Sequence, residues 1–249
     1  MCGCTARLAL TSAALLLSTL LRAEIATVAV AANFAVPLRS MTATFEEQTG
    51  HSLVLVPGST GQIYAQILNG APFDVFLAAD SDRPARLAED GLAVGASRFT
   101  YARGRLVLWS ADPRAFDGRG IEMLAGGEFR HIAIASPELA PYGAAARQVL
   151  EQLELWEALR PRVAIGQSIG QAFAMAATGN AELGLVALSQ ALAYDGPASY
   201  VTVPPAFYEP IEQDAILLSR GAENAAAVAL MAFLQSTETR RIIREFGYL

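Results

Sequence analysis

The chain has 249 residues, a formal net charge of −6 at pH 7, 53% hydrophobic residues and 17% charged ones. This length suffices for one large domain or for two smaller domains with cores of their own. The apolar share excludes a disordered chain, and the acidic balance argues against binding to nucleic acid or to an anionic membrane surface.

Residues 1–23 have the pattern of a secretory signal peptide. Arg7 supplies the positive start, Leu8 to Leu21 is an apolar run shorter than a typical membrane span, and Ala23 is a small residue before the expected cleavage point. An uncleaved membrane anchor is the alternative. Cleavage would remove both cysteines and lower the basic count from 18 to 16 against 24 acidic residues, a net charge of −8. We expect an exported, soluble protein without disulfides.

Short apolar strands alternate with amphipathic helices along the rest of the chain. The expected strands are residues 27–32, 52–56, 74–79, 105–110, 131–136, 162–166, 182–188, 198–203 and 214–219. The expected helices lie between Pro37 and Gly50, around Ile63 to Leu68, after Asp80, at 143–159, at 169–178, after Ser189, at 222–235 and at 237–246. The alternation predicts α/β layers with largely parallel sheets. If there are two domains, the segments "TYARGR" and "FYEPIEQ" pass between them.

The segment Gly166 to Gly170 fits G-x-S-x-G, the nucleophile elbow of serine hydrolases, between an apolar run and a helix. Such a hydrolase needs a histidine after the serine, but His51 and His131 both precede Ser168. The chain also has no lysine to replace the histidine as base. A secreted serine hydrolase acting through Ser168 is therefore the least favoured hypothesis, and we expect no catalytic residues.

Four turns of small and polar residues follow expected strands and precede helices. They are Ala32-Asn33-Phe34, Gly58-Ser59-Thr60-Gly61, Ala140-Pro141-Tyr142-Gly143 and Gly166 to Gly170. Free N–H groups at a helix start bind anions, and ligands of open α/β sheets lie at the carboxyl ends of strands. Four such turns, two in each half, fit helix starts that converge in a cleft. Small polar residues also cap helices without binding anything, which is the alternative at each turn.

Metal chemistry has weaker support in the sequence. Asp74 begins an expected strand, while Asp80 and Asp82 are placed to cap a helix. The chain lacks the HExxH, EF-hand and dinucleotide-binding motifs. We expect no cofactor.

Several motifs together resemble the periplasmic molybdate-binding proteins of ABC transporters. They are "TVAVAANF", "PGSTGQIYAQILNGAPFDVFLAAD", "PELAPYG", "GQSIGQAF" and "ELGLVALSQA", and the similarity extends to "IIREFGYL". The resemblance implies an α/β periplasmic-binding-protein fold with a ligand cleft between two lobes. The first lobe would comprise residues 24–104 plus 208–249, and the second residues 105–207.

The resemblance also implies the ligand-binding residues. Those matched by motif are Ala32, Asn33, Ser59, Thr60, Tyr142 and Ile169. In the family, Tyr142 and Ile169 match positions that contribute backbone N–H groups, and the second turn contributes a serine hydroxyl. Some members add a tyrosine where this chain has Ala187. Ser168 becomes a neighbour of the anion or a helix cap.

The function implied is capture of molybdate or tungstate and delivery to an ABC transporter permease. The protein would act as a periplasmic monomer, and molybdenum would enter only as the bound oxyanion, without direct protein–metal ligands. Backbone N–H groups and hydroxyls would stabilise the dianion, helped by the positive ends of helix dipoles. The first alternative is a binding protein for another tetrahedral oxyanion such as sulfate.

Overall fold

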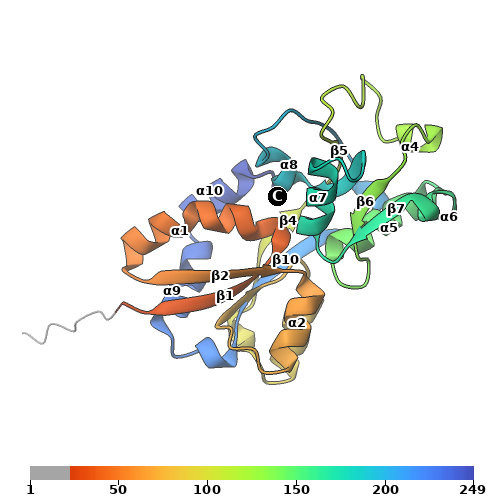
Figure 1. The fold of residues 1–249 in the computed structure, drawn as a ribbon. Coiled ribbons are helices and arrows are strands. Elements are labelled where there is room, and N and C mark those ends of the chain that lie inside the picture. The colour runs from red at the N-terminus through yellow and green to blue at the C-terminus, as the bar shows by residue number, and fades with distance from the viewer. Residues whose placement is uncertain (1–22) are drawn as a thin grey trace, which may run out of the picture.

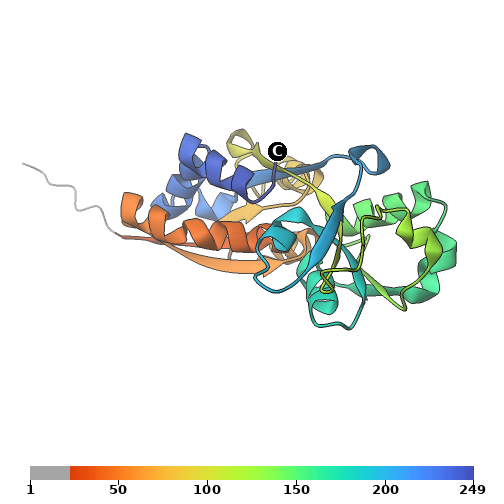
Figure 2. The ribbon, with the colours of Figure 1, turned by 90° about the horizontal axis from the view of Figure 1, so that it is seen from above.

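A computed structural model describes residues 23–249, so nearly all of the expected signal peptide lies outside the described part. Two α/β lobes, each built on a five-stranded sheet, lie side by side (Figures 1 and 2). In this part of the chain, no helix has the length and apolarity needed to cross a membrane.

The sheet of the first lobe has the order β2-β1-β3-β10-β4. Its strands are β1 Ile25–Ala31, β2 Ser52–Gly58, β3 Val75–Leu77, β4 Phe99–Gly104 and β10 Ile211–Leu217. β1 pairs in parallel with β2 and β3, whereas β10 is antiparallel to β3 and β4. The last strand of the fold therefore lies between two strands that are much earlier in the chain.

Five α-helices cover this first sheet. They are α1 Ala35–Thr49, α2 Thr60–Leu68, α3 Asp82–Glu89, α9 Ala225–Leu234 and α10 Thr237–Glu245. α1 buries the periodic side chains Leu38, Met41 and Phe45, as their spacing predicts, and ends at Gly50, whose φ of 70° is in the left-handed region that glycine favours. The C-terminal helices α9 and α10 pack beside α1, so both ends of the chain contribute to one lobe (Figure 2).

The sheet of the second lobe has the order β7-β6-β8-β5-β9. Its strands are β5 Leu106–Ser110, β6 Ile132–Ala135, β7 Val163–Gly166, β8 Leu183–Ala187 and β9 Ser199–Thr202. β6 is parallel to β7 and β8, and β5 is antiparallel to β8 and β9. Each sheet thus has two parallel and two antiparallel pairings, which makes both sheets mixed and not largely parallel as the sequence suggested.

The helices of the second lobe are shorter than the sequence predicts. They are α4 Met123–Gly126, α5 Pro141–Gln152, α6 Trp156–Leu159, α7 Ile169–Ala177 and α8 Leu188–Leu192. The single helix expected at 143–159 is divided because Glu154 adopts a φ of 58° and the N–H of Leu155 donates to the carbonyl of Leu150 at 2.8 Å. That left-handed residue ends α5 and starts a new turn.

Single 3-10 turns join several of these elements: η1 Ala32–Phe34, η2 Gly95–Ser97, η3 Arg160–Arg162, η4 Pro205–Phe207 and η5 Ser219–Gly221.

The segments expected only to pass between domains have regular structure. "TYARGR" lies mostly in β4, and β10 begins at Ile211, three residues before the expected strand. Both segments gain their structure from pairing with each other, a long-range contact that local sequence patterns do not reveal.

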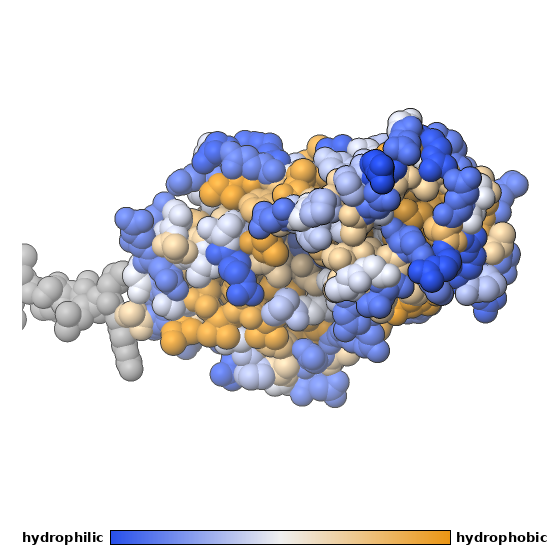
Figure 3. Space-filling view, turned by 45° about the horizontal axis from the view of Figure 1, so that its top comes forward, coloured by the Kyte–Doolittle hydropathy of each residue, from blue (hydrophilic) through white to orange (hydrophobic). Residues whose placement is uncertain are grey.

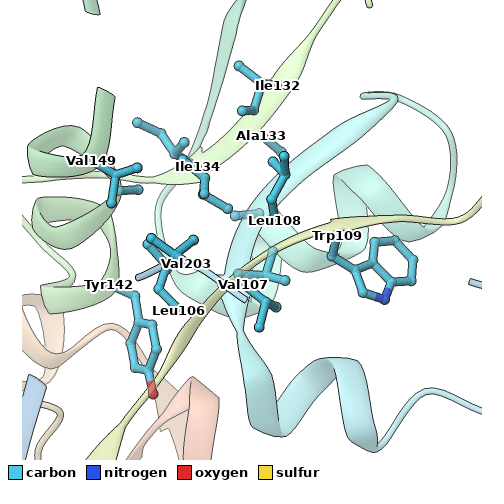
Figure 4. Packing of buried hydrophobic residues seen from close by; sticks show 14 of the residues in the cluster. Leu106, Val107, Leu108, Trp109, Ile132, Ala133, Ile134, Tyr142, Val149 and Val203 are labelled. Atoms are coloured by element: carbon cyan, nitrogen blue, oxygen red, sulfur yellow. The ribbon is translucent and has the colours of Figure 1, made fainter. Parts of the chain in front are cut away.

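The core of the second lobe surrounds β5, β6 and β8 (Figure 4). Trp109 is fully buried there and packs against Phe173 and Tyr194, with ring centroids 5.0 and 5.1 Å away. Each large apolar side chain buried in such a core contributes about 1.5–3 kcal/mol. Tyr142 lies at the edge of the cluster, and its hydroxyl points away from the labelled apolar side chains (Figure 4). The surface is more hydrophilic than this core. In Figure 3, hydrophilic residues follow most of the outline, and hydrophobic residues lie toward the middle and lower part.

Candidate functional site

A small cavity of about 10 Å³ lies between the lobes, at the carboxyl ends of parallel strands β1, β2, β6 and β7. All six residues that the sequence singled out line it: Ala32, Asn33, Ser59, Thr60, Tyr142 and Ile169. They come from four separate turns, the first four from one lobe and the last two from the other. The folded chain therefore brings all of them together, in a space of about one water molecule.

The first-lobe turn at Gly58–Gly61 holds two buried hydroxyls. Ser59 caps α2, and its Oγ accepts a hydrogen bond from the N–H of Gln62 at 3.3 Å. Thr60 is the first residue of α2, and its Oγ1 accepts from the N–H of Ala79 at 3.0 Å. Because both oxygens act as acceptors in these bonds, both hydroxyl hydrogens are available to an acceptor in the cavity.

Two helices of the second lobe begin at the cavity. Tyr142 follows Pro141 in the first turn of α5, and Ile169 is the first residue of α7. N–H groups in the first turn of an α-helix have no acceptor within the helix. Both residues can therefore present a backbone donor, and the positive end of each helix dipole points the same way.

Ser168 has a structural role in the same turn. It is the N-cap of α7, and its Oγ accepts from the N–H of Gln171 at 3.3 Å, which confirms the expected helix cap. Within residues 23–249 no hydrogen bond joins Ser168 to a histidine. His131 is exposed, whereas His51 is buried and accepts from the N–H of Glu24 at 3.1 Å.

Asn33 is held by contacts to both lobes. Its Nδ2 donates to Oε1 of Gln213 at 2.8 Å and to the hydroxyl of Tyr248 at 3.0 Å. Its carbonyl oxygen accepts from Oγ of Ser189 at 3.0 Å and from the hydroxyl of Tyr248 at 2.9 Å. Both amide hydrogens are thus engaged by protein atoms, and Oδ1 is buried without a partner among residues 23–249.

A layer of buried polar side chains behind the cavity escaped the sequence analysis. Gln213 donates from Nε2 to the hydroxyl of Tyr142 at 3.1 Å, and its Oε1 also accepts from the hydroxyl of Tyr101 at 3.0 Å. Burial raises the pKa of Tyr101 and of Tyr142 well above the usual value, so both stay neutral near pH 7. The only sequence signal was a glutamine beside an apolar run, in a segment we had assigned to a connection.

The electrostatics of the cavity rest on dipoles. None of the residues that line it is charged. A larger hollow of about 690 Å³ lies elsewhere between the lobes, but its charged lining consists of Asp80, Asp82, Glu209 and Glu212 with Arg83. Four carboxylates against one guanidinium disfavour an anion there, so the small uncharged cavity is the better anion site.

Direct contacts across the cleft hold the lobes together around the cavity. The N–H of Gly61 donates to the carbonyl of Leu139 at 2.8 Å, and Nε2 of Gln62 donates to Oε1 of Gln167 at 2.6 Å. Arg83 donates to the carbonyl of Glu138 at 3.2 Å. The structure is thus a closed form in which the cavity lined by the six predicted residues has almost no free space.

Two α/β lobes closed over a polar, uncharged cavity at helix starts define a two-lobe solute-binding protein. The chain belongs to the bacterial extracellular solute-binding protein family, whose model matches residues 26–249. It is 50% identical over 221 residues to the molybdate-binding protein ModA of Rhodobacter capsulatus, covering 89% of this chain and 86% of that one. It is also 50% identical over 224 residues to ModA of Azotobacter vinelandii, covering 89% of this chain and 88% of the relative.

The fold agrees with solved structures of this class. The periplasmic molybdate-binding protein of Azotobacter vinelandii superimposes with a TM-score of 0.85 at 43% identity, covering 90% of this chain and 98% of that one. A sulfate-binding protein of Mycobacterium tuberculosis has a TM-score of 0.74 at 15% identity, covering 90% of this chain and 86% of that one. The second similarity shows the fold alone.

Proposed function

We propose that this protein binds molybdate and tungstate in the cavity between its lobes and delivers them to an ABC transporter permease. The observation that carries the proposal is the meeting of all six motif-matched residues around one uncharged cavity at helix starts. The 50% identity to two molybdate-binding proteins supports the choice of oxyanion. The site binds and releases its ligand without chemistry.

The donors suit a tetrahedral dianion. We assign the hydroxyls of Ser59 and Thr60 and the backbone N–H groups of Tyr142 and Ile169 to its oxygens. Charge-assisted bonds of this kind are about twice as strong as neutral ones, and the helix dipoles add favourable potential without a counter-charged side chain. A net acidic protein can therefore bind an anion, because distant surface charges are screened over about 10 Å.

The cavity must enlarge to admit the ligand. A space of about 10 Å³ holds one water at most, so the lobes move apart when an oxyanion of five heavy atoms enters. We assign residues 24–104 plus 208–249 to one moving body and residues 105–207 to the other. The protein acts as a monomer in the periplasm after removal of residues 1–23.

Thermal denaturation with candidate anions tests the proposal. A ligand present at 1,000 times its Kd stabilises the native state by about 4 kcal/mol. Because each kcal/mol shifts the midpoint by roughly 2–4 °C in a protein of this size, molybdate and tungstate should raise Tm by on the order of 10 °C. Sulfate should raise Tm much less. Phosphate should fail because it largely keeps a proton near pH 7 that the N–H donors cannot accept.

Calorimetric titration with the same four anions provides the control. Equal Tm shifts and equal affinities for sulfate and molybdate would support the alternative of a general oxyanion-binding protein. No binding of any of the four would remove the oxyanion proposal.

A further inference from the structure

The inference concerns Gln213, which lies in β10 where that strand enters the first lobe and is fully buried. Its side-chain amide contacts one cavity residue from each lobe: Oε1 accepts from Asn33 Nδ2 at 2.8 Å, and Nε2 donates to the Tyr142 hydroxyl at 3.1 Å. Tyr101 also donates to Oε1, at 3.0 Å. One amide thus determines how the polar groups on both sides of the cavity are oriented.

Within this group of side chains, the hydrogen bonds in the closed form leave Asn33 Oδ1 without a donor. Asn33 Nδ2 uses both of its hydrogens, on Gln213 and on Tyr248, while Asn33 Oδ1 is buried with no partner among residues 23–249. A lone buried acceptor is unfavourable, because it has lost its contact with water without gaining a donor. It also cannot help an oxyanion, which has only acceptor atoms and needs N–H or O–H donors.

Rotating both amides by 180° gives a second arrangement of the same atoms. Gln213 Nε2 then donates to Asn33 Oδ1 and to the hydroxyl of Tyr101, which still has the carbonyl of Ala78 as its acceptor at 3.1 Å. Gln213 Oε1 accepts from Tyr142, and the hydroxyl of Tyr248 donates to Asn33 Oδ1 in place of the Asn33 carbonyl, which still accepts from Oγ of Ser189. Asn33 Nδ2 moves to the position of the lone oxygen and becomes a free donor.

The two rotations must occur together. If only one amide turned, two oxygens or two NH₂ groups would face each other at the present Asn33–Gln213 separation of 2.8 Å. Neither pairing provides a hydrogen bond, because two acceptors or two donors face each other. The first arrangement leaves a lone acceptor and gives the Tyr142 hydroxyl hydrogen no acceptor among residues 23–249, whereas the second leaves a lone donor. An acceptor-rich ligand pairs with that donor and so stabilises the second arrangement.

We propose that Gln213 is a positioning residue that sets the orientation of the Asn33 amide, and that the two amides rotate as a pair when an oxyanion binds. This inference rests on the proposed function, because the oxyanion is the group that accepts from the released Asn33 Nδ2. Gln213 contacts no ligand itself. It acts through Asn33 in one lobe and Tyr142 in the other.

The test variant is Gln213→Glu. When ionised, the new carboxylate accepts from Asn33 Nδ2, Tyr101 and Tyr142 but cannot donate, so it holds Asn33 in the first arrangement while keeping the size of the side chain. The titrations are therefore repeated at rising pH, because burial favours the protonated acid, which can donate. Calorimetry with molybdate should show an affinity about 10- to 150-fold weaker than wild type, the range expected for one charge-assisted bond. Gln148→Glu is the matched control, since Gln148 bonds only the N–H of Glu209 at 2.9 Å, and should bind within about 2-fold.

The Gln213→Glu substitution also adds a negative charge near the ligand. Introducing it into the Asn33→Ala variant separates the effect of that charge on affinity from the effect that acts through the Asn33 amide. If Gln213→Glu acts through Asn33, adding it to Asn33→Ala should change the affinity by less than about 3-fold, because interacting residues are not additive. A full repetition of the loss in that background would overturn the inference. So would Gln213→Glu binding molybdate as well as wild type.

A spectroscopic measurement covers the case in which the variant folds poorly. In the ¹H–¹⁵N spectrum of the wild-type protein, the side-chain NH₂ signals of Asn33 and Gln213, assigned by triple-resonance experiments on the wild-type protein alone, should both shift when molybdate is added. Shifts of the Asn33 signals alone would overturn the coupled rotation and leave molybdate binding intact. A wild-type protein that does not bind molybdate would overturn both proposals.

Discussion

The turns Gly58–Gly61 and Gly166–Gly170 are close counterparts in opposite lobes. Each follows a strand that is paired in parallel, and each has a serine as the N-cap of the next helix. Ser59 and Ser168 both accept from the N–H three residues later, and both distances are 3.3 Å. The side chains of Gln62 and Gln167 bond directly across the cleft.

The two turns differ in the two residues that follow the capping serine. The first helical residue is Thr60 in one lobe and Ile169 in the other, so only the first turn brings a hydroxyl at that position. The second is a glycine in both, but the N–H of Gly61 donates to Leu139 across the cleft. The same capped turn therefore presents different groups: the first has a hydroxyl at the first helical position and a main-chain bond across the cleft, and the second has an apolar residue at that position and a side-chain bond across the cleft.

The strongest test of this difference is truncation at the first helical position. Thr60→Ala removes a hydroxyl that we assign to the ligand and should weaken molybdate binding by about 1.5–3 kcal/mol, or roughly 10- to 150-fold. Ile169→Ala keeps its backbone N–H and should weaken binding less, through packing alone. Thr60→Ser is the control that retains the hydroxyl. If calorimetry gives the two alanine variants equal affinities, the turns contribute in the same way and the distinction fails.

The glycines test the contact between the lobes. A Cβ at position 61 would lie 2.9 Å from the carbonyl oxygen and 3.1 Å from the Cα of Leu139, whereas a Cβ at position 170 would meet the Ala32 Cβ at an ordinary 3.4 Å. Overpacking of this kind costs about 1–3 kcal/mol, so Gly61→Ala should disfavour closure and weaken binding roughly 5- to 150-fold. Gly170→Ala should bind nearly as wild type. Small-angle scattering with molybdate should show a more open Gly61→Ala protein, and unchanged closure would contradict the prediction.

The smallest expected effect is shared by the two turns. Ser59→Ala and Ser168→Ala each remove a helix cap and should lower the free energy of unfolding by about 1 kcal/mol. Denaturant unfolding measures both values. Because Ser168 caps α7 and makes no hydrogen bond to a histidine within residues 23–249, we expect hydrolysis of activated esters to be at background in wild type and in Ser168→Ala. A serine-dependent rate would restore the hydrolase hypothesis.

The turns were predictable from sequence because their determinants are local. Glycine and serine before an apolar helical pattern specify a capped helix start, and the alternation of strands and helices placed such starts at one edge of each sheet. The strand alternation also gave the fold class. Motif resemblance then selected the six residues that the folded chain gathers around one cavity.

The polar layer behind the cavity was not predictable in the same way. Gln213 is 180 residues from Asn33 in sequence, and Tyr248 is 215 residues from it. The position of Gln213 depends on β10 pairing with β4. β4 lies mostly in one segment that we had assigned to a connection, and β10 begins in the other. Glu154 was missed for a different reason: a left-handed glutamate that ends a helix has no strong sequence signal.

The position of β10 between β3 and β4 has a consequence for the order of assembly. Every strand of the second sheet comes from residues 106–202, so that sheet can form as soon as this continuous segment is available. The first sheet has a gap between β3 and β4 until residues 211–217 arrive, and the backbone bonds of Leu249 to Arg103 await the last residue. The lobe that contains the start of the chain is therefore the last to be finished.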